Sequence, residues 1–291
     1  MHACGHDAHV AMLASAARLL SDNKDELTGK VRFMFQPGEE GYHGARYMIE
    51  EGVLDGVDRA FAIHVSTNAP NGLLATKGGP LLASADRFEI TVHGKGGHAS
   101  APHNTVDPIP ATGAMIGSLQ SVVSRNIDPT KSAVLTVAHI QAGTTNNIIP
   151  ASAFLEGTIR TFDENVRSLS HSALDRVAQG TASAHGCTCS CEVIPGYPVT
   201  VNNDEQAALA GQVASALVGA DGFQFMEQPI MAAEDFSYVL NEVPGAMVML
   251  GVCPNDVSPQ DAAPNHSNFM RVNESAFYNG VGLYAAMAMV R

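Results

Sequence analysis

The sequence predicts an α/β protein in which one α/β domain is interrupted by a second, smaller domain. Three observations support this prediction. Short apolar segments alternate with segments of helical periodicity towards both ends of the chain, which indicates a layered α/β domain. Between them the order changes to strand-helix-strand-strand-helix-strand, the ferredoxin-like unit. The length of 291 residues suits two domains better than one. We therefore expect the α/β domain at 1–83 and 197–291 and the inserted domain at 84–196.

The first part of the α/β domain should contain two helices and two strands. Apolar residues at helical spacing predict a first helix, with Asp7 as its cap. These residues are Val10, Leu13, Ala14, Ala17 and Leu20. The elements expected after it are a strand at 31–35 that stops at Pro37-Gly38, a helix at 45–51 ended by Gly52, and a strand at 60–65.

The inserted domain should begin with a half-buried strand, because Phe88, Ile90 and Val92 alternate with polar residues. A Gly-rich loop at 94–98 follows it. The remaining elements expected in this domain are a helix at 108–124, strands at 133–140 and 154–161, a helix at 164–184 and a strand at 188–194. The α/β pattern then resumes with helices at 205–218 and 233–240, a strand at 246–252 and a helix at 274–290.

The composition argues against several classes of function. The formal net charge of -13 argues against a nucleic-acid partner, because phosphate binding needs clustered Lys and Arg. No run of about 18 apolar residues indicates a membrane span, and no basic segment before an apolar core indicates a signal peptide. Five cysteines without an evident pairing framework favour a reducing compartment. We therefore expect a cytoplasmic protein that does not associate with membranes.

Residues that are typical metal ligands occur in four separate places, each where a predicted strand or loop ends. Ligands of α/β proteins often bind outside the carboxyl ends of strands. Thiolate, imidazole and carboxylate donors together suit zinc or another first-row divalent ion, whereas calcium prefers oxygen. Because five ligands exceed one tetrahedral site, we expect two ions that share a bridging ligand. The candidates are Cys4 and His6, Glu39 and Glu40, His64, and His266.

The adjacent carboxylates of Glu39 and Glu40 indicate the chemistry. Neighbouring carboxylates repel each other unless a cation lies nearby. We expect one to bind metal and the other to act as general base towards a water that the metal acidifies, an arrangement suited to amide hydrolysis. Each feature also has a structural interpretation: the two carboxylates as a solvated turn, His64 as a core histidine and His266 as a loop residue. Their joint occurrence favours the metal site.

Six motifs follow one another along the chain: Met1-His2-Ala3-Cys4-Gly5-His6-Asp7, Phe35-Gln36-Pro37-Gly38-Glu39-Glu40, Ala62-Ile63-His64, Gly96-Gly97-His98-Ala99-Ser100, Asn147-Ile148-Ile149-Pro150 and Ala233-Glu234-Asp235-Phe236. Together they closely resemble the dinuclear metal-dependent amidohydrolases related to hippurate hydrolase, auxin-conjugate hydrolases and N-acetyldiaminopimelate deacetylase. These enzymes belong with the metallopeptidases of the aminoacylase and glutamate carboxypeptidase type. The resemblance covers essentially the whole chain.

The resemblance implies a role for each candidate residue. Cys4 would bridge two ions, and Glu39 would be the general base. His98 resembles the histidine that reaches a partner subunit's active site and stabilises the oxyanion, while Asn147 and Arg160 resemble positions that meet the substrate. The remaining metal ligands would be His6, Glu40, His64 and His266.

The resemblance also implies an activity, a cofactor and a partner. The activity is hydrolysis of the amide bond of small-molecule N-acyl amino acids, with release of a carboxylate and an amino acid. The cofactor is two divalent metal ions per chain, Zn or Mn first, with Co or Ni as alternatives. The catalytic domain would have the metallopeptidase-type α/β fold. The inserted domain would serve as a lid and would join two chains into a homodimer.

Two alternatives stay open from the sequence. Family members carry a longer segment before the Cys-Gly-His motif, so we expect this chain to be truncated, to keep its metal ligands and to bind metal weakly. In the first alternative it is an inactive remnant that folds and dimerises through the lid domain. In the second it is a thiol-dependent hydrolase that uses Cys4 as nucleophile. Metal analysis and chelation separate these alternatives from the metal-dependent enzyme.

Overall fold

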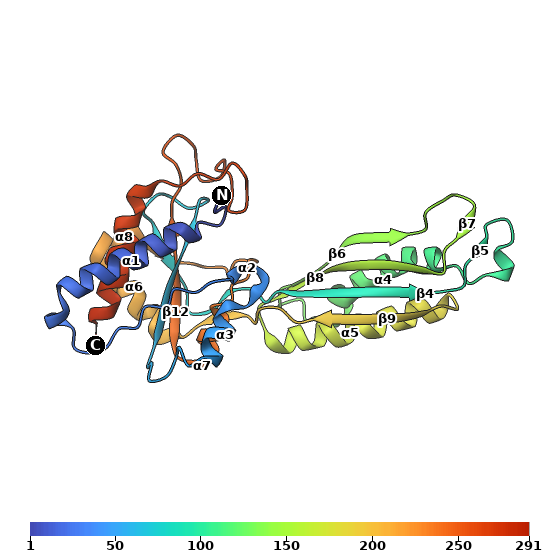
Figure 1. Ribbon diagram of the computed structural model, residues 1–291, viewed down its shortest axis with the longest axis horizontal. Coiled ribbons are helices and arrows are strands. Elements are labelled where there is room, and N and C mark those ends of the chain that lie inside the picture. The colour runs from blue at the N-terminus through green and yellow to red at the C-terminus, as the bar shows by residue number, and fades with distance from the viewer. Residues whose placement is uncertain (291) are drawn as a thin grey trace. The chain divides into compact units, whose positions relative to one another are not determined.

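The computed structural model describes residues 1–290, and the chain divides into two compact units (Figure 1). Unit 1 consists of Met1–Leu81, Thr200–Pro229 and the residues from Asp235 onward. Unit 2 consists of Leu82–Val199 and Ile230–Glu234. Both units pack helices on sheets, which confirms the predicted α/β class.

Unit 1 is built on a four-stranded sheet with the order β1-β12-β2-β11. β1 and β12 run parallel, β12 and β2 antiparallel, and β2 and β11 parallel. Two further strands, β3 and β10, form a separate pair. The strands are β1 (Ala60–Ser66), β2 (Leu74–Thr76), β3 (Gly79–Leu82), β10 (Thr200–Asn202), β11 (Phe223–Phe225) and β12 (Gly245–Gly251).

The main core of unit 1 lies between this sheet and three helices, α1 (His6–Asp22), α6 (Asp204–Val218) and α8 (Phe277–Met289) (Figure 1). Leu250 of β12 and Leu283 of α8 are fully buried in it. Full burial of one such side chain stabilises the fold by about 1.5–3 kcal/mol. This core fixes the positions of α1 and β1, which carry two of the candidate metal ligands, His6 and His64, near their ends.

Helix α1 is present as predicted, but its buried face and its cap differ from the prediction. Val10, which belongs to the predicted stripe, is 53% exposed. The residue before the helix is Gly5, with a left-handed φ of 85°, and Asp7 lies inside the first turn. The apolar pattern predicted the wrong buried face because alanines occur on several faces of this helix. The buried side chains are Ala8, Met12, Ala16 and Leu20.

Residues 31–35 do not form the predicted strand. The chain from 31 to 38 has no regular structure, and none of the sheets formed by residues 1–290 includes it. Phe35 is 45% exposed although its neighbours are partly buried. An apolar β-branched and aromatic run has the propensity of a strand, but a strand also needs a neighbour for its backbone hydrogen bonds. No described strand provides that neighbour here.

The other predicted elements of unit 1 are present with shifted ends. The helix predicted at 233–240 begins only at Ser237, and the segment predicted at 274–290 starts as a 3-10 turn, η4 (Glu274–Ala276), before α8. The remaining helices and turns of this unit are α2 (Glu39–Tyr42), α3 (Gly44–Glu50), α7 (Ser237–Glu242), η1 (Lys24–Glu26) and η3 (Ala220–Gly222).

Unit 2 contains a four-stranded antiparallel sheet with the order β6-β8-β4-β9. Two helices, α4 and α5, lie side by side against it (Figure 1). The elements follow the predicted order along the chain. They are β4 (Asp86–His93), β5 (Gly97–His98), η2 (Pro102–Asn104), α4 (Pro108–Asn126), β6 (Ala133–Ala142), β7 (Ile148–Ile149), β8 (Ser152–Thr161), α5 (Glu164–Ala184) and β9 (Thr188–Ile194).

Clear local signals explain why unit 2 agrees with the prediction. Phe88, Ile90 and Val92 are fully buried while the intervening residues of β4 are not, so the alternation predicts the core face correctly. Asp163 caps α5 by accepting hydrogen bonds from the backbone amides of Asn165 and Val166. The predicted ends of α5 and β9 coincide with the observed ones.

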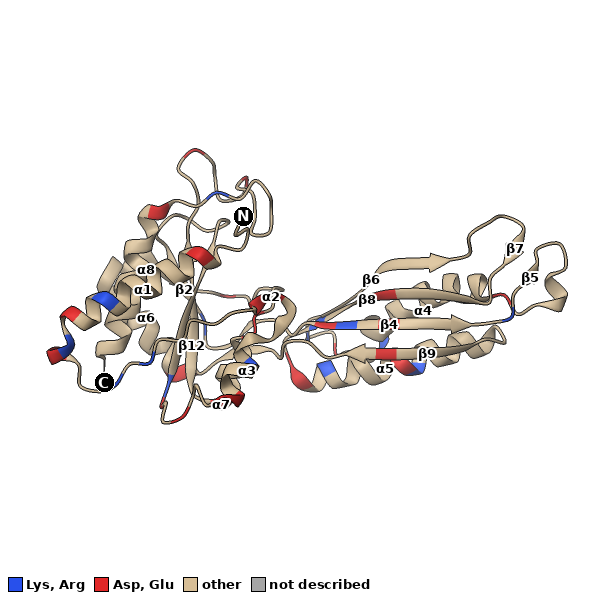
Figure 2. Ribbon diagram, in the orientation of Figure 1, with Lys and Arg blue, Asp and Glu red and all other residues tan. Residues whose placement is uncertain are grey.

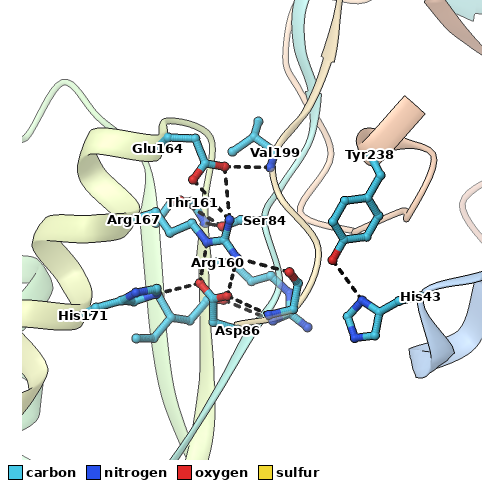
Figure 3. Close-up of polar contacts among 12 residues, drawn as sticks. His43, Ser84, Asp86, Arg160, Thr161, Glu164, Arg167, His171, Val199 and Tyr238 are labelled. Atoms are coloured by element: carbon cyan, nitrogen blue, oxygen red, sulfur yellow. Dashed lines mark hydrogen bonds and ion pairs between the residues drawn. The ribbon is translucent and has the colours of Figure 1, made fainter. Parts of the chain in front are cut away.

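A buried ionic cluster within unit 2 joins β4 to α5 (Figure 3). The Asp86 carboxylate accepts hydrogen bonds from Nη2 and Nε of Arg167 at 2.6 and 2.9 Å and from Nε2 of His171 at 2.8 Å. The backbone amide of Gly196 donates a further one at 3.0 Å. Burial raises the pKa of Asp86, but Arg167 and His171 outweigh it and hold this pKa well below its usual value. The cluster therefore contains a carboxylate that stays ionised although it is buried.

We expect the substitution Asp86→Ala to lower the free energy of unfolding by about 3–5 kcal/mol, because the buried Arg167 guanidinium loses its buried carboxylate partner and keeps only the exposed Glu164 carboxylate and the Gly196 carbonyl. A folded-state pKa below the unfolded value means that the stabilisation is present above pH ~4 and is lost as the pH falls through the lower, folded-state pKa. Denaturant unfolding from pH 7 down to pH 2 measures both effects. Asp256→Ala removes an exposed Arg271 pair and is the control, expected to change stability far less. Equal losses in the two variants would contradict this prediction.

No helix within residues 1–290 is both long and apolar enough to cross a membrane. Lys and Arg are scattered along helices, strands and loops of both units rather than concentrated on one element (Figure 2). None of the five cysteines in the described chain forms a disulfide.

Candidate metal centre

Gly5 brings Cys4 and His6 to the N-terminus of α1. Its φ of 85° lies in the left-handed region, which glycine adopts without steric cost. A Cβ atom at this position would also collide with the side chain of Val65 on β1. Both observations explain why only glycine fits between the two candidate ligands. The close approach places Cys4 and His6 next to the end of the strand that carries His64.

His64 near the end of β1 presents a neutral imidazole to Cys4. Its Nδ1 lies 2.8 Å from the Val65 carbonyl oxygen, which can only accept, so Nδ1 carries the proton. Nε2 therefore offers its lone pair and lies 3.5 Å from the Cys4 Sγ. Burial lowers the pKa of His64 to about 4, partly opposed by the bond to Val65. A neutral imidazole oriented through a backbone carbonyl is the usual form of a metal-binding histidine.

The segment from Gly38 to Tyr42 directs two neighbouring carboxylates to different places. Glu40 has a non-helical ψ of 75°, which interrupts the short helix α2. The Glu39 side chain is 17% exposed and its Oε2 lies 3.6 Å from Nε2 of His6. The Glu40 side chain is 53% exposed and its Oε1 lies 3.1 Å from Nε2 of His266. The two carboxylates therefore contact different histidines.

Glu39 differs from Glu40 in its electrostatic surroundings as well. Burial, followed by the charges of Glu40 and Asp235, raises the pKa of Glu39 to about 7. A hydrogen bond from the Asp235 backbone amide to the Glu39 carboxylate partly opposes this rise. A carboxyl group whose pKa lies near neutrality can both take up and release a proton at physiological pH.

Asp235 fixes both sides of the segment that carries these carboxylates. Its side chain is fully buried and accepts hydrogen bonds from Nε2 of Gln36 at 2.6 Å and from the backbone amide of Ala45 at 3.0 Å. His43, which has a positive φ of 55°, adds a contact of 2.9 Å between its Nδ1 and the Tyr238 hydroxyl (Figure 3). Gln36 and Ala45 flank the carboxylates on both sides, so the segment is held at two points.

The loop that carries His266 closes the site within unit 1. His266 has a positive φ of 73°, and its backbone amide donates to the Ala3 carbonyl. Its Nε2 lies 3.1 Å from the Cys4 Sγ and 3.1 Å from the Glu40 Oε1. The candidate ligands thus form two groups that share one sulfur, and in each group the donor atoms lie within 4.8 Å of one another. The groups are Cys4, His6 and His64, and Cys4, Glu40 and His266.

The donor set fits divalent metal ions. Nε2 of His6 is buried without a hydrogen-bond partner, although a buried imidazole nitrogen normally has one. Burial lowers the pKa of His6, which favours the neutral form that binds metal. Sulfur, nitrogen and oxygen donors in one place suit zinc and its first-row neighbours. Unit 1 therefore brings together every residue that the sequence analysis suggested as a metal ligand.

The three other candidate residues belong to unit 2. His98 ends β5 and is exposed, and its Nδ1 accepts from the Ser100 amide, so the proton lies on Nε2. The carbonyl of Asn147 accepts from the Ala99 amide, which places Asn147 beside His98. Arg160 is half-buried on β8 at the Asp86 end of the sheet, whereas β5 follows the opposite end of β4. Burial lowers the pKa of Arg160. Unit 2 therefore brings His98 and Asn147 together but not Arg160.

Two further residues support the centre, Asn265 and His9. The sequence indicates His9 either as a residue behind the ligands or as an ordinary residue of the first helical turn, and it does not mark Asn265. Asn265 contacts the segments of Cys4 and His64, which lie 261 and 200 positions away. His9 accepts a hydrogen bond from the Val65 amide through Nε2, so its proton lies on Nδ1. A histidine one turn after His6 was the available signal for His9, but no sequence pattern marks the contacts of Asn265.

Comparison with known proteins places the chain in a family. The family model described as peptidase family M20/M25/M40 matches residues 1–290. The chain belongs to this family. It is therefore related to hydrolases, as the motifs predicted.

Individual proteins are similar to this one over most of the chain. The chain is 41% identical over 292 residues to thermostable carboxypeptidase 2 of Saccharolobus solfataricus, with coverage of 99% of the chain and 73% of that protein. It is 44% identical over 251 residues to N-acetylcysteine deacetylase of Bacillus subtilis, with coverage of 86% of this chain and 65% of that protein. The structure is similar to that of the Bacillus subtilis YXEP protein, described as a dinuclear metal binding peptidase from the M20 family. The TM-score is 0.82 and the sequence identity is 34%. The match covers 99% of this chain and 72% of the YXEP chain. The M20 peptidase fold and the amidohydrolase and peptidase class are thus confirmed.

Proposed function

We propose that this protein is a metal-dependent amidohydrolase that cleaves the amide bond of N-acyl amino acids. The observation that supports this most directly is the pair of donor groups that meet at Cys4. Two divalent ions per chain, Zn or Mn first and Co or Ni as alternatives, would be held by these residues. Cys4 would be the residue shared by both ions, and His6, Glu40, His64 and His266 would be the other ligands. The description of the similar YXEP protein as dinuclear is consistent with this number.

Glu39 is the general base. A pair of divalent ions supplies an acidified water and a polarised carbonyl group. Glu39 lies beside the ligand set, so its carboxylate can accept a proton from water and return it to the departing nitrogen. The products are a carboxylate and a free amino acid. Glu40 cannot share this role because its carboxylate is directed to His266.

The substrate contacts are assigned to unit 2. His98 carries its proton on Nε2 and can donate to an oxyanion, and Asn147 beside it can meet the substrate. Arg160 lies at the other end of the sheet, so it would pair with a substrate carboxylate apart from His98 and Asn147. The relative named N-acetylcysteine deacetylase supports an N-acyl amino acid as substrate.

The domain organisation proposed from the sequence completes this function. A catalytic domain at 1–83 and 197–291 would carry the metal centre, and an inserted ferredoxin-like domain at 84–196 would act as lid. The inserted domain would also form a homodimer, and the enzyme would be cytoplasmic. The strand order β6-β8-β4-β9 with two helices on one face supports the ferredoxin-like assignment.

Chelation tests this function directly. We expect dialysis against a strong chelator to abolish hydrolysis of N-acetyl amino acids, and Zn or Mn to restore it together with about two ions per chain in elemental analysis. A chain that binds ions but hydrolyses no N-acyl amino acid contradicts the proposed activity. A chain that binds no ion and hydrolyses nothing is the inactive remnant. Activity that survives chelation indicates the thiol-dependent hydrolase instead.

A further inference from the structure

The side-chain amide of Asn265 connects three chain segments of unit 1. Its Nδ2 donates to the Cys4 carbonyl at 3.1 Å and to the Val65 carbonyl at 3.1 Å. Its Oδ1 accepts from the Thr67 backbone amide at 3.3 Å. The amide thus uses both of its protons and one lone pair on the backbones of other segments. Asn265 itself precedes His266, so each segment that it joins carries a candidate metal ligand.

The contact with Val65 acts on the orientation of His64. The Val65 carbonyl accepts from Nδ1 of His64 at 2.8 Å and from Nδ2 of Asn265, one for each of its lone pairs. The hydrogen bond to Nδ1 keeps the lone pair of Nε2 directed towards the Cys4 Sγ. By fixing this carbonyl, Asn265 fixes the imidazole through it. In metal sites, the hydrogen bond made by the ring nitrogen that does not bind metal sets the orientation of the histidine.

The contact with Cys4 acts on the shared donor. Two hydrogen bonds hold residues 3 and 4 to the loop that carries His266. The His266 amide donates to the Ala3 carbonyl, and Nδ2 of Asn265 donates to the Cys4 carbonyl. The Cys4 Sγ then lies 3.1 Å from Nε2 of His266. Loss of the Asn265 amide removes the restraint on Cys4 and on His64 in one step. Both donor groups share Cys4 and therefore loosen together.

We infer that Asn265 is a positioning residue that holds Cys4, His64 and His266 in the arrangement that binds the metal pair. This inference rests on the proposed function. Its short contacts are to backbone atoms behind the donor atoms. Its side-chain contacts are longer: Oδ1 accepts from the Thr67 hydroxyl at 3.5 Å, and Nδ2 lies 4.0 Å from the Cys4 Sγ. A loop residue that only stabilises the fold would not affect the affinity for metal, and this difference makes the role measurable.

Asn68 provides a matched control. Its Nδ2 donates to the carbonyls of Pro259 and Ala262, so it fastens the same loop region with the same chemical group. None of these contacts involves a candidate ligand or the residue next to one. Asn68→Ala should therefore lower the free energy of unfolding about as much as Asn265→Ala does, without changing the affinity for metal.

The test compares Asn265→Ala and Asn68→Ala with the unaltered full chain. The affinity for Zn is measured by competition with a chromophoric chelator, and the Cys4 bond is followed by the thiolate-to-metal absorption of the Co-loaded protein. Thermal unfolding without metal measures the fold alone. We expect Asn265→Ala to bind Zn about 10- to 100-fold more weakly and to alter the Co absorption. Asn68→Ala should match the unaltered chain in both metal measurements.

The outcomes separate this inference from the proposed function. An unaltered chain that binds no ion overturns the proposed function and this inference with it. An unaltered chain that binds two ions while Asn265→Ala binds them equally tightly overturns the inference alone. An equal loss of affinity in Asn68→Ala also overturns it, because the effect would then be general to the loop. If Asn265→Ala does not fold, Asn265→Ser is measured, and wild-type affinity in that variant overturns the inference.

Discussion

Replacement of Glu39 by Gln is expected to lower kcat for N-acyl amino acid hydrolysis by about 10²- to 10⁴-fold, the usual contribution of a general base. Gln keeps the size of the side chain but cannot accept a proton. The Glu39 carboxylate lies within 4.8 Å of donor atoms of His6 and Glu40 but belongs to neither of the two groups that share Cys4, so the variant should still bind about two ions per chain. The measurement is steady-state kinetics together with elemental analysis of the same sample.

Glu50→Gln is the matched control for this prediction. Glu50 is an exposed carboxylate on α3, paired with Arg46 at 3.7 Å, and lies outside the ligand set. Its replacement should leave kcat and metal content unchanged. If Glu39→Gln retained kcat within a few fold, another group would be the base. If it lost the ions, Glu39 would be a ligand and the division of roles between the two carboxylates would be wrong.

Replacement of Cys4 by Ala is expected to abolish binding of the ion pair. Its Sγ belongs to both donor groups, so each group falls to two protein donors. The affinity for Zn should fall by more than ~100-fold, the upper range for changes in residues that only support a ligand. Metal content after gel filtration and the competition measurement both test this expectation.

Cys253→Ala is the corresponding control. Cys253 is buried in the same unit, and its Sγ contacts the carbonyls of Pro254 and Val257 rather than a candidate ligand. This variant should keep about two ions. Full metal binding by Cys4→Ala would refute the shared-sulfur arrangement. Loss of activity in Cys4→Ala with unchanged metal content would instead favour the thiol as nucleophile.

The sequence predicted unit 2 better than unit 1 for a physical reason. In unit 2 the signals are local: alternation in β4 and a capping Asp163 before α5. In unit 1 the sheet pairs β1 with β12, far apart in the chain. The strand predicted at 31–35 failed because propensity does not provide a pairing partner.

In the candidate site, too, the sequence predicted the features that depend on neighbouring residues and not those that depend on distant contacts. Short motifs marked each donor, because Cys, His and Glu at the ends of strands are unusual enough to notice. The backbone geometry at Glu40 and His266, which directs the donors, was not predictable from those motifs. Asp235 and Asn265 act on residues roughly 200 positions away, and a single sequence does not report such contacts.

The hydrogen bond between Ala3 and His266 also affects the folding of the chain. The Cys4 and His266 donors are separated by 262 positions, so their encounter closes a very large loop. Closing such a loop costs more conformational entropy than forming a local contact, and folding is slower where such distant contacts dominate. Ions that bind only the completed arrangement would then draw the folding equilibrium towards it by mass action. Metal availability would in this way govern how much of the protein is folded, in addition to what it catalyses.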